Sequence, residues 1–254
     1  MWPKGVVANR IADHVDRTGG KLAVMEVRIG LGYIAVLLEG KRLGLAALLQ
    51  ADLPTNCTAV REAGGLAGEK ASHLLNLLSA GQNPLEKALG LATANAILSV
   101  GQPADNQDAI GLMNLTPSDR VVMVGLFPPL IPKIQNSGAA LTVIERNPAR
   151  LAPVPPKAQQ EALKECTVAI ITATTLLNGT FENIINALTS LTTPRHVALL
   201  GPSTPLYPDA FTDTPVNHLG GAIARDRWKI LRVVSEGGGT PAMRPYLDFI
   251  NLLR

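Results

Sequence analysis

The feature that most constrains the fold is a regular alternation of short apolar runs and helical patterns after residue 120. Apolar runs of the length of buried strands cover residues 121–127, 140–145, 168–172, 196–200 and, more weakly, 216–219. Helical patterns cover residues 129–135, 156–165, 179–190, 226–234 and, as a last amphipathic helix, 245–253. Because strands that alternate with helices form parallel sheets, this half predicts a Rossmann-like, doubly wound α/β domain.

The first half of the chain has a different pattern, in which strands are followed by helices. The predicted elements are a helix over 6–17, three strands within 21–49, a helix over 69–79 and another that begins after Asn83. This order predicts a small α+β domain. Residues 101–119 are polar and rich in turn formers, which suits a linker. We therefore predict one domain at residues 1–104 and a second at residues 105–254.

The composition excludes several classes of protein. Hydrophobic residues make up 46% of the chain and charged residues 17%, which excludes wholesale disorder. A net charge of +3, with four Phe, two Trp and three Tyr, does not suit a nucleic-acid-binding surface. No apolar run approaches the length of about 18 residues that a membrane span needs, and the two cysteines form no CxxC pair. We expect a cytoplasmic protein without nucleic-acid or membrane partners; its oligomeric state is left open.

The loops that follow the predicted parallel strands are the expected ligand-binding region, because ligands bind at the carboxyl ends of such strands. These loops cover residues 125–129, 145–148, 172–180, 201–205 and 220–221. They are rich in glycine, which lets a ligand approach the backbone, and in hydroxyl and amide side chains. The sequence therefore predicts a small-ligand site at this edge of the sheet.

Glu145 is the most specific candidate in these loops. It ends the second predicted strand 20 positions after Gly125, where a nucleotide-binding sheet places an acid that binds the ribose. The residues around Gly125 form no GxGxxG motif, and Pro128 and Pro129 lack the N–H groups that a phosphate would need. The structural alternative is that Glu145 pairs with Arg146 or caps a neighbouring helix.

Asn178 and Thr204 also have a structural alternative. Asn178 precedes a predicted helix as an N-cap would, and Thr204 precedes Pro205 as a cap precedes a first-turn proline. A capped helix still presents free backbone N–H groups to a ligand, so both residues remain site candidates.

Metal ligands are harder to identify from spacing. The histidines form no HxH or HExxH pattern and are scattered at His14, His73, His196 and His218. His218 lies just before Gly220, at a predicted strand end, and Cys57 lies in a loop that could reach a domain cleft. The candidate metal ligands are therefore Glu145, His218 and Cys57, whereas Cys166 is interpreted as a small buried hydrophobe.

Several sequence runs resemble one known family. The runs VVMVGLFPPL, LTVIERNP and VALLGPSTPLYPDAF in the second half, with VRIGLGYIAVLL and GLATANAIL in the first, are similar to the bacterial and archaeal family named putative heavy-metal chelation proteins. The resemblance implies a domain like the N-terminal domain of enolase, packed on a Rossmann-like domain with the active site between them. It places the cofactor-binding candidates at Gly125, Phe127, Pro128, Glu145, Asn147, Thr172, Thr174, Asn178, Gly201, Ser203, Thr204 and Gly220.

The leading functional hypothesis is a role in heavy-metal handling, by binding a metal complex or by acting on a chelating cofactor. Glu145, with an acid from the first domain, would supply oxygen ligands or a general base, and Ser203, Thr204 and Asn178 would orient the ligand. The cofactor is then a heavy or transition metal. An alternative is an enzyme with a nucleotide-type cofactor such as S-adenosylmethionine, whose ribose Glu145 would bind. A third possibility is a non-catalytic small-molecule sensor or carrier.

Overall fold

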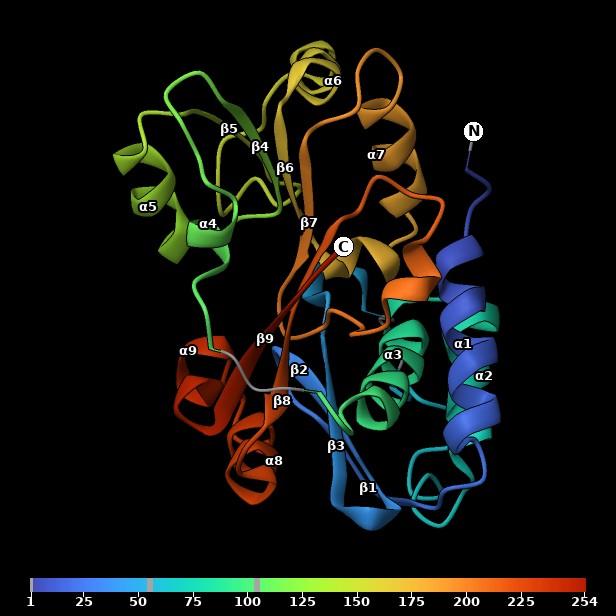
Figure 1. Cartoon of the computed structure of the whole chain (residues 1–254). Helices are drawn as coiled ribbons and strands as arrows, with labels where there is room; N and C mark the ends of the chain where they lie inside the picture. Colours follow the sequence, from blue (N-terminus) through green and yellow to red (C-terminus); the bar gives the residue numbers. More distant parts are fainter. Residues whose placement is uncertain (1, 54–56, 103–105) are drawn as a thin grey trace.

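The alternation after residue 120 forms the predicted parallel sheet. The structure is a computed structural model that describes residues 2–53, 57–102 and 106–254 (Figure 1). In the described part of the chain the larger sheet has the order β5-β4-β6-β7-β8-β9, in which β8 and β9 are antiparallel and the other neighbours are parallel. The strands are β4 Arg120–Val124, β5 Ala140–Ile144, β6 Val168–Thr172, β7 His196–Leu200, β8 His218–Ala224 and β9 Leu247–Leu253. The order confirms the doubly wound sheet.

Helices cover both faces of this sheet. They are α4 Ala109–Leu112, α5 Ile131–Asn136, α6 Pro156–Glu165 and α7 Phe181–Leu188. α4 and α5 pack on one face, where Ile134 is fully buried, and α6 and α7 pack on the other through Leu163 and Phe181. Burial on both faces explains why the strands read as continuous apolar runs. Among the described residues, none of the helices has the length and apolar character that crossing a bilayer requires.

Two sequence predictions near the end of the chain are wrong. Residues 245–253 are not a helix, because Leu247–Leu253 form β9 and all seven residues pair with β8. β8 itself does not end at residue 219, but continues through Gly220 and Gly221 to Ala224. The apolar spacing in β9 also fits a helix, but the backbone groups at the edge of β8 need a pairing partner. Tertiary pairing therefore outweighs the local pattern.

The first half forms a three-stranded antiparallel sheet with helices on one face. Its elements are α1 Val6–Gly19, β1 Val24–Ile29, β2 Tyr33–Leu38, β3 Arg42–Ala47, α2 Ala71–Ala80 and α3 Pro84–Leu98. α3 is buried on almost every side, with residues 88–98 all inaccessible or nearly so. Gly44 in β3 allows this close packing, because a Cβ there would lie 2.0 Å from the carbonyl O of Ala92.

The other face of the small sheet is covered by residues from the second half. α8 (Arg227–Ser235), α9 (Thr240–Met243) and β9 pack on β2 and β3 in a separate apolar cluster that includes Tyr33, Leu43 and Ile230. Figure 1 shows α8 and α9 in the lower half of the molecule, with the small sheet, while α5 and α6 lie in the upper half. The two halves are thus joined by packing as well as by the chain. The predicted division between residues 104 and 105 lies outside the described residues and stays a prediction.

Candidate functional site

The strand order of the parallel sheet reverses between β4 and β6, so the loops after these strands flank the expected ligand crevice. Gly125 follows β4 with a φ of +86°, and a Cβ there would lie 2.6 Å from Cγ2 of Thr172. The hydroxyls of Thr172 and Thr174 are 3.0 Å apart. A Cβ on Gly201 would lie 3.9 Å from the ring of Phe127. The structure therefore brings these five candidates into two contacting groups at the carboxyl edge.

The carboxylate of Glu145 is buried and hydrogen-bonded within the protein. Oε2 accepts from the backbone N–H of Leu126 at 3.1 Å and from Nη1 of Arg150 at 2.9 Å. Oε1 accepts from the backbone N–H of Asn147 at 2.9 Å. Glu145 thus holds together the loops after β4 and β5. Its position favours a structural role over contact with a ribose or a metal, because its oxygens are already engaged.

The other candidates of these two loops lie at the surface. Pro128 and Asn147 are exposed, and Oδ1 of Asn147 accepts from the backbone N–H of Ala149 at 3.0 Å. The expected Glu145 partner, Arg146, pairs instead with Asp52 of the first half. Arg146 therefore links the two halves of the chain, and Glu145 forms its ion pair within the loop with Arg150 instead.

Ser203 also links the two halves. Its Oγ accepts from the backbone N–H of Ala47 at 2.8 Å, and its carbonyl O accepts from Nδ2 of Asn95 at 3.1 Å. Nδ2 of Asn95 also donates to the carbonyl O of Leu45 at 2.8 Å. Ser203 is 3% exposed. It therefore fixes the loop after β7 to β3 and α3, a role that differs from the expected orientation of a ligand.

Thr204 and Asn178 do not cap helices directly. Thr204 is buried, its hydroxyl donates to the carbonyl O of Leu199 at 3.4 Å, and the next helical turn starts only at Pro208. Oδ1 of Asn178 accepts from the N–H and the hydroxyl of Thr180, at 3.1 and 2.7 Å, and α7 starts after that residue. Both predicted caps are wrong, because each loop continues for at least two residues beyond the predicted cap before its helix begins. Gly220, inside β8, is likewise not in a loop.

The three candidate metal ligands form no common site. His218 is fully buried at the start of β8, with Nδ1 3.0 Å from Nε2 of His196 and Nε2 2.9 Å from Oδ1 of Asn251. Cys57 is exposed, and Glu145 is held as described above. Over residues 2–53, 57–102 and 106–254, no group of three or more His, Cys, Asp or Glu side chains is arranged to hold a metal ion. His218 misses the carboxyl edge because β8 continues beyond it.

The buried histidine pair predicts acid sensitivity. Burial, together with the neighbouring His218 and Arg195, lowers the pKa of His196 to about 4. The unfolded chain therefore binds a proton below about pH 6.5 that the folded protein does not bind, and we expect the free energy of unfolding to fall by about 2–3 kcal/mol between about pH 6.5 and 4. Urea unfolding at a series of pH values measures this slope. His196→Gln should remove most of it, and the exposed-site control His73→Gln should keep it; a slope that survives in His196→Gln contradicts the assignment.

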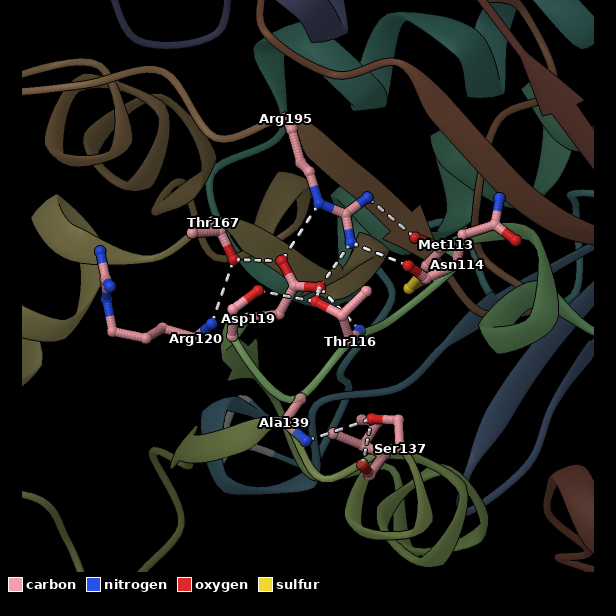
Figure 2. Close-up of polar contacts among 11 residues, drawn as sticks. Met113, Asn114, Thr116, Asp119, Arg120, Ser137, Ala139, Thr167 and Arg195 are labelled. Carbon is pink, nitrogen blue, oxygen red and sulfur yellow. Dashed lines mark hydrogen bonds and ion pairs between the residues drawn. The ribbon is translucent and has the colours of Figure 1, made fainter.

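A cluster of polar side chains lies at the opposite, amino edge of the sheet (Figure 2). Asp119, Thr167 and Arg195 immediately precede β4, β6 and β7. Asp119 accepts from Nη2 of Arg195 at 2.7 Å, from the hydroxyl of Thr167 at 2.7 Å and from the N–H of Thr116 at 2.8 Å. The Arg195 guanidinium holds the pKa of Asp119 well below its usual value. Because these groups satisfy one another at the edge away from the ligand crevice, the cluster is structural.

A cavity of about 370 Å³ lies between the two halves, next to the loop after β6. Its polar lining comes from Lys4, Gly5, Ser79 and Lys87 of the first half and from Asn178, Gly179 and Glu182 of the second. Gly5 precedes α1, whose first turn carries no acidic side chain. Glu182 is 4% exposed, and its Oε1 accepts from the N–H of Gly5 at 3.1 Å. The cavity thus combines two ammonium groups with one buried carboxylate, which is held at the N-terminus of a 14-residue helix.

Sequence reasoning missed most of this cavity and identified only Asn178. The rule for parallel sheets selects loops of the second half, but it does not indicate which elements of the first half meet them. Lys4 and Lys87 therefore carried no signal. Glu182 carried none either, since an acid in the first turn of a helix is common.

Comparison with known proteins gives consistent matches over both halves. A family model described as "Putative heavy-metal chelation" (DUF364) matches residues 108–252, and a second with the same description (DUF4213) matches residues 12–98. A DUF364 protein of unknown function from Pyrococcus horikoshii is 20% identical, with a TM-score of 0.82 over 98% of this chain and 100% of that one. One from Desulfitobacterium hafniense is 18% identical, with a TM-score of 0.82 over 99% of each chain. No curated protein sequence matches significantly.

Proposed function

Since the chain belongs to the DUF364 family, described as "Putative heavy-metal chelation", we propose that it binds a small anionic metal complex in the cavity between its halves. One observation carries this proposal: Lys4 and Lys87 line the same cavity, and the acid of its lining, Glu182, is already engaged by the N–H of Gly5. Ammonium groups attract negative charge and pair well with carboxylates. The volume of about 370 Å³ is within the range of small-ligand sites.

The two lysines of the lining outnumber its one acid, Glu182, and this excess of positive charge favours a metal that arrives with its own chelator. A protonated lysine cannot ligate a cation, but it pairs well with the carboxylates of an acidic chelator such as citrate. The chelator would supply the metal ligands, and the protein would recognise the remaining negative charge. The side-chain amide of Asn178 also lines the cavity and adds an uncharged hydrogen-bond donor and acceptor. This form of metal handling requires no cluster of protein ligands.

The nucleotide-cofactor alternative receives less support from the geometry. It relied on Glu145 as the group that binds ribose hydroxyls, and that carboxylate is occupied by Leu126, Asn147 and Arg150. The proposal therefore assigns ligand binding and no reaction.

Titration calorimetry with ferric citrate, citrate alone and a divalent metal alone tests the proposal. We expect ferric citrate to bind, and Lys4→Gln with Lys87→Gln to weaken its affinity at least about tenfold, which corresponds to about 1.4 kcal/mol. Lys157→Gln, on the exposed surface of α6, is the matched control and should leave the affinity unchanged.

The other outcomes of this experiment contradict the proposal. Binding of the bare metal with higher affinity than the citrate complex would indicate direct chelation by the protein. Equal affinities in the lysine variant and in Lys157→Gln would place the ligand elsewhere.

A further inference from the structure

The outer face of α8 is basic and carries an exposed aromatic side chain. Residues 225–232 contain four basic residues and one acid, Asp226. Trp228, Lys229 and Arg232 are all exposed, Trp228 to 59%. Because residues three and four positions apart are neighbours on a helix surface, these three side chains lie on one face of α8. Figure 1 shows α8 at the lower end of the molecule.

The acids that contact this segment are already engaged. The carboxylate of Asp226 is the N-cap of the helix and accepts from the backbone N–H groups of Trp228 and Lys229, both at 3.1 Å. Arg225, just before the helix, pairs with Asp248 at 3.5 Å. Both acids are thus bound to groups of the same chain and leave the centre of the face uncompensated.

Lys229 and Arg232 form no ion pair with any residue that the structure describes. Glu236, four positions after Arg232, has the spacing of a helical ion pair, but it forms none in the described structure. The face therefore keeps a positive charge that acidic side chains of a partner would complement.

Trp228 gives this face an anchor that is already ordered. The guanidinium of Arg227 lies 5.4 Å from the centre of the indole ring, within the range of a cation–π contact. The contact restricts the side chain before binding, so less conformational entropy is lost when a partner packs on it. Tryptophan is also enriched among the residues that dominate protein–protein binding energies. The combination favours a docking surface over a helix face that is merely solvated.

The packing of α8 favours a protein partner over a bilayer or a nucleic acid. A helix that lies on a membrane buries its apolar face there, but Ile230, Leu231 and Val234 of α8 are buried against the small sheet. Nucleic acids are bound by longer arrays of cations and stacking side chains, and the described part of this face offers two unpaired cations and one indole ring. A short acidic peptide segment is matched by so few groups.

We propose that the outer face of α8 docks an extended acidic segment of a partner protein. Lys229 and Arg232 are three positions apart, which separates their Cβ atoms by about 5–6 Å. Alternate residues of an extended strand share a face and are about 6–7 Å apart. Two alternate acids therefore pair with the two cations, and an apolar side chain at the next alternate position packs on Trp228. The proposed ligand is not involved, because no residue of α8 lines the cavity.

Fluorescence polarisation with labelled peptides tests the proposal. The probe Leu-Ser-Glu-Ser-Glu-Ser-Leu carries its acids at alternate positions, whereas Leu-Ser-Glu-Glu-Ser-Ser-Leu has the same composition with its acids on opposite faces. We expect the first peptide to bind, and the second to bind at least about tenfold more weakly. Trp228→Ala, and separately Lys229→Glu with Arg232→Glu, should each weaken binding of the first peptide at least about tenfold.

The matched control changes the same amount of charge on a distant helix. Lys157→Glu with Lys164→Glu, at exposed positions of α6, should leave the affinity unchanged. Circular dichroism of each variant checks that the fold is intact. The proposal is overturned by a first peptide that does not bind, by equal affinities of the two peptides, or by an equal loss in the α6 variant. Tighter binding of duplex DNA or of phosphatidylglycerol vesicles than of the first peptide also overturns it.

Discussion

Replacing Asp119 by alanine is expected to lower the free energy of unfolding by about 3 kcal/mol. The change removes a buried carboxylate that holds Arg195, Thr116 and Thr167, and it leaves their donors without a shared acceptor. These partners belong to the segments before β4, β6 and β7, so the loss separates three strand starts at once. Denaturant unfolding at neutral pH measures the effect.

The contribution of Asp119 should also depend on pH. Because the folded state lowers the pKa of this carboxyl group, its stabilisation is present above the unfolded pKa and is lost as pH falls toward the folded value. The difference between wild type and Asp119→Ala should therefore shrink below about pH 4. Asp213→Ala removes an exposed carboxylate that also pairs with an arginine, and it should cost less than about 1 kcal/mol. Similar losses in both variants would show that the buried network is not what stabilises the sheet.

Replacing Gly44 by alanine is expected to destabilise the protein by about 3–4 kcal/mol, at the upper end of overpacking effects. The added Cβ would lie 2.0 Å from the carbonyl O of Ala92 and 2.1 Å from the N–H nitrogen of Ala96. Both contacts are with the backbone of α3, which cannot rotate away as a side chain can. α3 would have to move from β3, and it carries much of the core of the first half. Thermal and urea unfolding report the loss.

Gly111→Ala is the matched control for this prediction. Its Cβ would meet nothing closer than Cβ of Asp108 at 3.8 Å, and alanine is favoured over glycine in a helix such as α4. The control should therefore be neutral or slightly stabilising. A Gly44→Ala protein as stable as Gly111→Ala would show that α3 and β3 can separate at little cost.

The fold was largely predictable because its main signals are local. The apolar runs at 121–127, 140–145, 168–172 and 196–200 are interrupted by helical patterns, and this alternation is typical of folds with a parallel sheet. β9 was not predictable in the same way. Its spacing suits a helix, and only the exposed backbone of β8 makes it a strand. Local sequence carries no information about a pairing partner about 30 residues away.

The candidate site was less predictable, for a related reason. The loop residues Gly125, Thr172 and Thr174 do lie together at the carboxyl edge, because the strand register places them there. The hydrogen-bond partners of Glu145 and Ser203 could not be foreseen. The side chain of Arg150 donates to Glu145, and the backbone N–H of Ala47, in the other half of the chain, donates to Ser203. The domain division, the likeness to enolase and the ligand roles of these residues stay predictions.

The cover that α8 and β9 provide for the small sheet has a consequence for synthesis on the ribosome. Tyr33, Leu37 and Leu45 pack against residues that are translated roughly two hundred positions later. The nascent first half can therefore bury the face of its sheet that packs against α1, α2 and α3 early. The opposite face of the sheet stays exposed to solvent until residues 227–253 leave the ribosome. During this interval the apolar face of the small sheet is open to chaperone binding. The first half can therefore complete its folding only when the last strand has been synthesised.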